Sequence, residues 1–338
     1  MKNHGSDELL LQHACMALVD LCAFNNEKNR KEAEERRALI GKAGGGEAVT
    51  NAMRLHLTVA SLLKYACWAL MNLSCENNDN NNSRVRIAKA GGIDVVIDTM
   101  QKHPTAEGLL QQACAVLVNL SDNNIDNVIR IAEAGVEVVL DMMQKHPNAE
   151  GLLEQACAAL RNLSINDNNE IRIVGAGGIE VVVDMMQKHP TTEGLLEQAC
   201  AVLQHLSCNI DNHANQIHIA EAGGIEVVLD TMQKHPTAEG LLENACAALV
   251  NLSVNSDNER RIGKVGGIKV LVDSMERNST ATKVQEEAIW VLYNLSFDGS
   301  NKNEIAQTAA EAVKKAQRRF PSLKYPPKVL KRCWSIFP

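Results

Sequence analysis

Apolar and polar positions follow a pattern along this chain that recurs with a period of 43 residues in its central part. The stretch that begins at Val136, VEVVLDMMQKHPNAEGLLEQACAALRNLS, matches the stretch that begins at Ile179, IEVVVDMMQKHPTTEGLLEQACAVLQHLS, at most positions. Related copies begin at Ile93, Ile225 and Ile268, and degenerate ones lie near Val49 and in the terminal regions. A helical period of this length is typical of solenoids, which grow by stacking copies.

The spacing within one copy predicts three helices. The first is short, as in residues 127–135, and ends at Gly135, since glycine suits a left-handed helix cap. The second follows at once and carries an apolar stripe at i, i+3, i+4 and i+7. In one copy this stripe consists of Ile179, Val182, Val183 and Met186, while Glu180 and Asp184 face water. It ends at Gln-Lys-His-Pro, because proline prevents continuation.

The third helix is the longest. Its predicted N-caps are polar residues that precede an acidic residue in the first turn. The N-caps are Thr105, Asn148, Thr191 and Thr237, and the acidic residues are Glu107, Glu150, Glu193 and Glu239. One broad stripe should be buried: Leu152, Leu153, Ala156, Cys157, Leu160 and Leu163. On the opposite stripe, Gln155, Ala158 and Asn162 should point away from the core.

Composition fits close helix packing, because 45% of the residues are hydrophobic and only 3% are aromatic. Six of the ten cysteines recur once per copy: Cys15, Cys67, Cys114, Cys157, Cys200 and Cys246. Equivalent positions on stacked helices lie roughly 8 to 10 Å apart, which is too far for a disulfide. We therefore expect buried, reduced thiols that act as small apolar fillers.

The formal net charge of −7 has the wrong sign for binding nucleic acid, which needs clustered lysine and arginine. No apolar run is long enough to span a bilayer, and the first residues lack the features of a signal peptide. We therefore expect a cytoplasmic or nucleocytoplasmic monomer whose partner is another protein, with no nucleic acid and no membrane insertion.

Two motifs recur in register, A-x-G-(G)-I between the first two helices and (W/A)-x-x-x-Asn-Leu-Ser at the end of the third. Through them the chain, from about Asp7 to about Phe320, resembles the armadillo repeat family. The resemblance implies an all-α fold, a right-handed solenoid of three-helix repeats whose third helices line a concave groove. In members similar to importin-α and β-catenin, a groove asparagine binds the backbone of an extended peptide.

The resemblance places this asparagine at Asn72, Asn119, Asn162, Asn251 and Asn294, with His205 and Asp20 as departures. An amide offers both a donor and an acceptor, so it can pair with a peptide N–H and C=O. Alternatively, these amides cap the third helix or satisfy nearby carbonyl groups.

The family's groove tryptophan, four residues before the asparagine, is present as Trp68 and Trp290. In nuclear-import adaptors of the family, neighbouring tryptophans form slots that hold lysine side chains. Here alanine stands at this position in the other copies, which argues against a long row of such slots. Alternatively, both tryptophans are buried against the terminal repeats. Three residues before this position, the same groove should be lined by Gln112, Gln155, Gln198, Asn244 and Glu287. Arg161 adds one positive charge beside Asn162.

Catalysis is not expected, because no phosphate-binding loop and no paired carboxylates stand outside the repeat pattern. The histidines at 103, 146, 189 and 235 recur singly, which predicts a helix-end role and no metal site. No cofactor is expected.

We expect a scaffold that binds an extended or helical segment of a partner protein. The alternatives are a nuclear-transport adaptor similar to importin-α and an armadillo protein that acts on small GTPases.

The expected organisation is an N-terminal partial repeat or cap over residues 1–24, about six armadillo repeats over 25–300, and a degenerate repeat with a basic tail over 301–338. Such an end usually caps the last core. A second hypothesis is that the basic tail folds back on the more acidic body and competes with a ligand.

Overall fold

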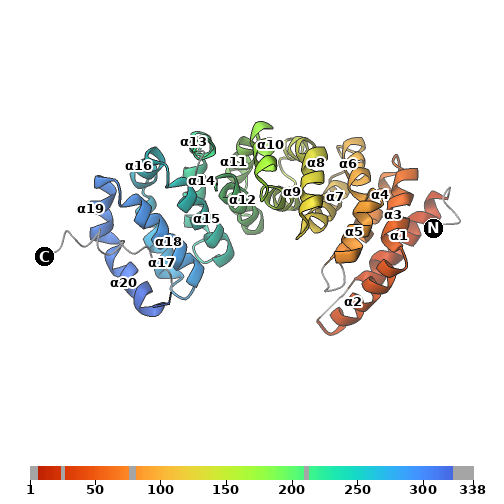
Figure 1. Ribbon diagram of the computed structural model, residues 1–338, viewed down its shortest axis with the longest axis horizontal. Coiled ribbons are helices and arrows are strands. Elements are labelled where there is room, and N and C mark those ends of the chain that lie inside the picture. The colour runs from red at the N-terminus through yellow and green to blue at the C-terminus, as the bar shows by residue number, and fades with distance from the viewer. Residues whose placement is uncertain (1–6, 24–26, 76–80, 209–212, 323–338) are drawn as a thin grey trace. The chain divides into compact units, whose positions relative to one another are not determined.

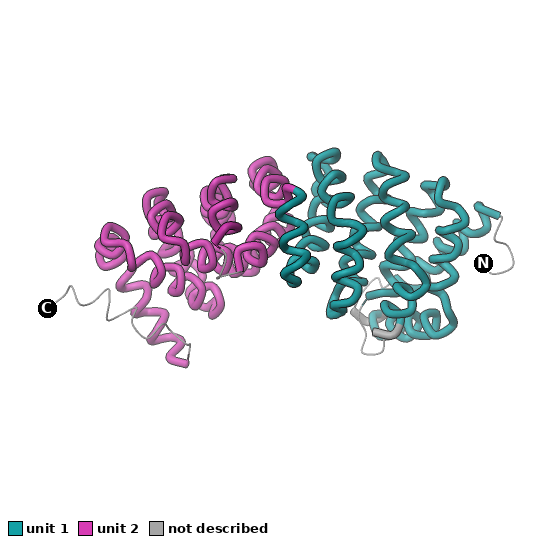
Figure 2. Tube along the Cα trace, turned by 45° about the horizontal axis from the view of Figure 1, so that its top comes forward, with its two compact units in different colours: residues 1–176 teal, residues 177–338 magenta. Residues whose placement is uncertain are grey.

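The computed structural model describes residues 7–23, 27–75, 81–208 and 213–322. These ranges contain twenty helices and no strand, which confirms the predicted all-α solenoid of armadillo repeats. The chain divides into two compact units, Met1–Ala176 and Gly177–Pro338 (Figure 2). Among the described helices, none is long and apolar enough to cross a bilayer.

Each unit consists of antiparallel helices stacked copy upon copy (Figure 1). Unit 1 contains α1 (Glu8–Cys22), α2 (Glu27–Lys42), α3 (Gly45–Leu55), α4 (Ala60–Ser74), α5 (Asn81–Lys89), α6 (Gly92–Lys102), α7 (Glu107–Ser121), α8 (Ile125–Lys145), α9 (Glu150–Leu163) and α10 (Asp167–Gly175). Unit 2 contains α11 (Gly178–Lys188), α12 (Glu193–Leu206), α13 (Ala214–Glu221), α14 (Gly224–Lys234), α15 (Glu239–Leu252), α16 (Ser256–Lys264), α17 (Gly267–Arg277), α18 (Thr282–Leu295), α19 (Gly299–Thr308) and α20 (Ala310–Arg319).

In one copy, for example, the first, second and third helices are α13, α14 and α15. A left-handed glycine separates the first and second helices of most copies. Gly177 and Gly223, for example, have φ values of 79° and 87°, a conformation that other residues adopt only with strain. The prediction that a helix ends at Gly135 was wrong, because α8 continues through it to Lys145. The sequence there is Ala-Gly-Val, with one glycine where other copies have two, so no residue is left over for the left-handed turn.

The predicted N-caps of the third helices were also wrong, by one residue. The N-cap positions are Ala106, Ala149, Thr192 and Ala238, and none makes a side-chain capping bond. Each helix then begins at the acidic residue, which lies where the helix dipole favours negative charge. The charge of this glutamate therefore stabilises the helix start where a polar cap was expected.

The core of each unit lies between its second and third helices. The predicted stripe of α9 is confirmed, since all six of its members are at most 2% exposed. The predicted stripe of α11 is likewise buried, with Glu180 and Asp184 exposed. Third helices also pack side by side within each unit, α1 on α4, α4 on α7 and α7 on α9, then α12 on α15 and α15 on α18.

Histidines at the ends of the second helices connect neighbouring copies. The His103 Nε2 lies 2.9 Å from the Leu57 carbonyl oxygen, and the His146 Nε2 lies 2.6 Å from that of Pro104. These histidines therefore stand at helix ends, as predicted, and also bond to the neighbouring copy. Within the described residues, no three histidine, cysteine or acidic side chains gather as metal ligands would.

The six recurring cysteines are buried free thiols, as predicted. Burial raises the pKa of Cys114 and of Cys200 to about 12, because the thiolate loses its hydration. These thiols therefore pack as small apolar groups. Cys208, in contrast, is exposed.

We expect Ellman's reagent to separate the cysteines into two kinetic classes in the native protein. Cys208 should react within the mixing phase, whereas the six buried thiols should react only as fast as the protein opens. Cys208→Ser should remove a fast phase and leave the slow ones unchanged. Reaction of Cys114 at the rate of Cys208, followed by mass spectrometry, would contradict the buried packing.

Candidate functional site

The predicted groove residues all lie on third helices, at equivalent positions of successive copies. We call the surface that they form in each unit its third-helix face. In unit 1 it comprises Trp68, Asn72, Gln112, Asn119, Gln155, Arg161 and Asn162. In unit 2 it comprises Gln198, His205, Asn244, Asn251, Glu287, Trp290 and Asn294.

The asparagine amides of these faces donate hydrogen bonds to the preceding third helix. The Asn162 Nδ2 donates to the Val118 carbonyl at 3.2 Å and to the Ser121 Oγ at 3.0 Å. In unit 2, the Asn294 Nδ2 repeats this geometry with the Val250 carbonyl at 3.2 Å. The same amide also donates to the Ser253 Oγ at 3.0 Å. Both hydrogens of each amide are therefore used inside the chain.

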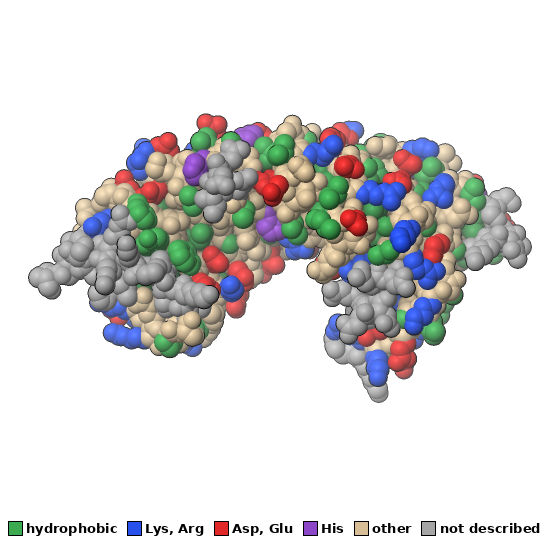
Figure 3. Space-filling view, in the orientation of Figure 1, with side chains coloured by type: hydrophobic (Ala, Val, Ile, Leu, Met, Phe, Trp, Pro, Cys, Tyr) green, Lys and Arg blue, Asp and Glu red, His purple; other side chains and the backbone are tan. Residues whose placement is uncertain are grey.

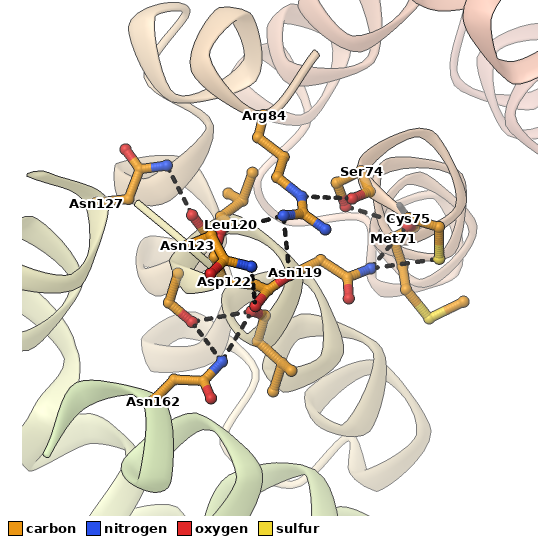
Figure 4. A network of polar contacts seen from close by, with 12 residues as sticks. Met71, Ser74, Cys75, Arg84, Asn119, Leu120, Asp122, Asn123, Asn127 and Asn162 are labelled. Atoms are coloured by element: carbon orange, nitrogen blue, oxygen red, sulfur yellow. Dashed lines mark hydrogen bonds and ion pairs between the residues drawn. The ribbon is translucent and has the colours of Figure 1, made fainter. Parts of the chain in front are cut away.

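The other asparagines follow the same rule. The Asn119 Nδ2 donates to the Met71 carbonyl at 2.9 Å and to the Cys75 Sγ at 3.5 Å (Figure 4). The amides of Asn251 and Asn72 reach the carbonyl groups of Gln204 and Val19. The acceptor is always the residue just before the equivalent position in the preceding copy. We call this row of bonds the third-helix amide ladder.

The amide ladder changes the predicted role of the asparagines. Asn162 does not point away from the core as expected, since it is only 8% exposed and its donors face the neighbouring helix. Its oxygen accepts from Arg161, with Nη2 at 3.1 Å. Within the described residues, no donor reaches the side-chain oxygens of Asn72, Asn119, Asn251 and Asn294. The groups left for a ligand are therefore acceptors.

The two tryptophans have different surroundings. Trp68 is 37% exposed, so it is not buried against the terminal repeat. The Trp290 ring stands edge-on to Tyr293 at a centroid distance of 6.0 Å, and Tyr293 stands edge-on to Phe297 at 5.2 Å. Aromatic pairs of this geometry are favourable beyond their buried area. Unit 2 therefore presents a short aromatic row over the last turns of α18 and just past its end.

The polar residues three positions before the tryptophan or alanine also differ between the units. In unit 1, the Gln112 Oε1 is buried and has no hydrogen-bond partner within the described residues. In unit 2, the Asn244 Nδ2 donates to the Glu197 carbonyl at 3.3 Å, about two turns before the Asn251 bond of the amide ladder. Gln155 and Gln198 are partly exposed. His205 is also partly exposed, at the position that asparagine holds in other copies.

Carboxylates gather on the unit 2 face, and Figure 3 shows acidic side chains over α15. Burial raises the pKa of Glu287 above its usual value, and the neighbouring carboxylates of Glu286 and Glu243 add to the effect. Lys283 opposes it. The face therefore holds negative charge that is only partly compensated.

Sequence reasoning missed a second ladder, which runs along the first helices. The Asn169 Nδ2 donates to the Val128 carbonyl at 3.3 Å, and the Asn258 Nδ2 donates to that of Gln216 at 3.0 Å. The Asn301 Nδ2 continues the row in the last copy. These side chains also recur once per copy, so their periodicity was the available signal.

Arg84 connects the ends of two third helices, as Figure 4 shows. Its Nε donates to the Ser74 carbonyl at 2.9 Å, and its Nη1 lies 3.0 Å from the Asp122 carboxylate. The guanidinium is buried, so loss of the Asp122 carboxylate would leave a buried charge without its counter-ion, which is destabilising.

Two family models match the chain. The model described as LRRK2 ARM repeat matches residues 8–176, which ends where unit 1 ends. The model described as Armadillo/beta-catenin-like repeat matches residues 255–297. A search of curated proteins found no match.

Solved structures resemble the chain over most of its length. An engineered protein is 25% identical with a TM-score of 0.71, over 94% of this chain and 75% of the other. Computationally designed armadillo repeat proteins for modular peptide recognition are 18% identical with a TM-score of 0.60, over 72% and 98%. A designed armadillo repeat protein in complex with the peptide (KR)4 is 18% identical with a TM-score of 0.53, over 70% and 98%.

We expect Asn162→Ala to lower the free energy of unfolding by about 1 to 3 kcal/mol, because it removes two hydrogen bonds between neighbouring third helices. Gln155→Ala, on the same helix, is the control. It makes no hydrogen bond within the described residues and should change stability by less than about 0.5 kcal/mol. Urea denaturation followed by circular dichroism measures both. Equal stabilities would mean that the amide ladder contributes nothing.

We expect Glu287→Gln to stabilise the protein at pH 7. Because the pKa of Glu287 is raised in the folded state, its ionisation opposes folding at neutral pH. The difference should fade as the pH falls below the ordinary value of about 4.5, because the carboxyl then becomes protonated in both states. Glu276→Gln, at an exposed carboxylate, is the control. A gain that is the same at pH 4 and pH 7 would contradict the charge effect.

Proposed function

The chain belongs to the armadillo-repeat family, and we propose on that premise that it is a scaffold whose third-helix faces bind an extended segment of another protein. The observation that carries the proposal is the row of asparagine oxygens left over by the amide ladder. Their orientation is set before a ligand arrives, because each amide nitrogen is already bonded to the neighbouring helix. Preorganised groups of this kind bind at a lower entropic cost.

The available chemistry favours recognition of a partner's main chain. A side-chain oxygen accepts from a backbone N–H whatever the adjacent side chain is. Successive third helices lie roughly 8 to 10 Å apart, and an extended chain rises about 3.3 Å per residue. Each copy would therefore meet about two to three residues of the partner.

Specificity would come from the positions at which the copies differ. In unit 1, Trp68 offers an exposed indole that can anchor an apolar or cationic side chain. In unit 2, the carboxylates of Glu243 and Glu286 lie near that of Glu287, about one turn before Trp290 on α18, which favours lysine or arginine in the bound segment. The faces of the two units thus suit different stretches of a partner.

This acidic face also supports a second candidate function, an adaptor that recognises basic localisation segments. A designed armadillo repeat protein with the same fold has been solved with the peptide (KR)4. Alanines at 201 and 247 remove the neighbouring tryptophans that long lysine slots require. We therefore place a general scaffold first.

A displayed library of random peptides, selected against the full chain, supplies a ligand for the test. We expect Trp68→Ala to weaken peptides that bind unit 1 by about tenfold or more, as loss of an aromatic anchor does. Fluorescence anisotropy measures the dissociation constant. Ile171→Ala is the matched control, because Ile171 is an exposed apolar residue of the same unit on a first helix.

Binding that is lost in Ile171→Ala and kept in Trp68→Ala would move the interaction to the first helices and refute the proposed face. Selected peptides rich in lysine, weakened by Glu287→Gln, would favour the adaptor.

A further inference from the structure

A small cavity recurs between the second helices of neighbouring copies, away from the third-helix faces. In unit 1 it has a volume of about 330 Å³ and is lined by the end of α6, by Leu110 and by one side of α8. In unit 2 its counterpart between α14 and α17 has a volume of about 350 Å³. Both receive an Asp and a Lys or Arg, four residues apart, from the second of the two helices.

The last cavity of this series, between α17, α18 and α20, differs in size. We call it the terminal cavity, and its volume is about 720 Å³. Ala312 stands where Val138 and Val270 line the other two. Its floor is apolar, because Met275, Ala312 and Ala316 are buried there. A volume of this order is typical of ligand sites, which span about 300 to 1,000 Å³.

The terminal cavity also carries more positive charge than the other two, because Lys315, Arg318 and Arg319 line it with a single carboxylate, that of Glu276. Lys315 takes the place that Asp141 and Asp273 hold in the other two cavities. Asp141 is paired with Lys145 at 2.6 Å, whereas the corresponding residues of α20, Lys315 and Arg319, are both cationic. Lys and Arg side chains lie over α20 on the face in Figure 3.

Together with Arg318, these two side chains form a cationic rim. No ion pair compensates any of the three within the described residues. Like charges four residues apart on a helix repel each other, so the rim gains from an anion.

A buried acceptor completes the terminal cavity. Gln285 lines it at the place of Leu110 and is only 2% exposed. Its Nε2 donates to the Met275 carbonyl at 2.7 Å and to the Asn278 carbonyl at 3.0 Å. Both donors are thus used, and within the described residues no donor reaches the oxygen. The oxygen retains access to solvent, so it can accept from a ligand that carries a donor.

We propose that the terminal cavity binds an acidic segment of a partner protein. A main-chain N–H of the segment donates to the Gln285 oxygen, an apolar side chain fills the space over Met275 and Ala312, and carboxylates meet the cationic rim. The chain's own residues 323–338, outside the described residues, contain four basic and no acidic residues. Their charge has the wrong sign, and a second copy would bring another cationic rim.

The test uses the full chain and a short fluorescein-labelled peptide that combines glutamate with leucine. We expect saturable binding, and Lys315→Asp should weaken it by about tenfold or more, since it reverses a charge at the rim. Gln285→Leu should also weaken it. Both variants restore residues that line the equivalent cavities, so the fold should tolerate them. Lys145→Asp, the matched change in unit 1, should leave binding unchanged.

Loss of binding in Lys145→Asp equal to that in Lys315→Asp would indicate a general charge effect and overturn the proposal. Equally tight binding of a peptide in which lysine replaces glutamate would also overturn it. Peptide binding that appears only when Trp334 and Phe337 are replaced by alanine would mean that the chain's own end occupies the cavity. That result would also overturn the proposal.

Discussion

The hydrogen bond from a side-chain amide to the backbone carbonyl of the neighbouring copy is the interaction on which the rest of this structure depends. It joins most of the third helices, through residues such as Asn162, and several of the first helices, through residues such as Asn169. Leucines and cysteines supply the apolar core, but their packing does not set a direction. The amides do, because a donor and an acceptor must face each other. Stability is therefore distributed along the chain, copy by copy.

The same interaction explains how one side chain can serve both the fold and the proposed binding. The amide nitrogen bonds to the neighbouring helix, and in copies such as those of Asn119 and Asn294 no donor within the described residues reaches the oxygen. The residues that recur from copy to copy therefore hold the fold together. The residues that could distinguish one ligand from another stand where the copies differ. Trp68 marks one such place and the carboxylates near Glu287 a second. Gln285 with the cations of α20 marks a third, on another surface of unit 2.

The sequence predicted the fold and the buried stripes, because both follow from local spacing. It did not predict that α8 continues through Gly135, since only the count of glycines distinguishes that copy. It placed the asparagines on the right helices and on one face. It could not tell where their donors go, because each acceptor lies about 44 residues earlier and its direction depends on how the helices stack. The terminal cavity was missed for the same reason, although Lys315 lies within the residues 301–338 that were predicted to hold a basic tail.

Hydrogen exchange of the asparagine side-chain amides, measured by NMR on the free protein, tests the amide ladder most directly. Asn168 is exposed on α10 and serves as an internal reference. The side-chain amides of Asn119, Asn162 and Asn294 should exchange at least about tenfold more slowly than that of Asn168, because each must leave its carbonyl acceptor first. Exchange of all four at the same rate would contradict the account.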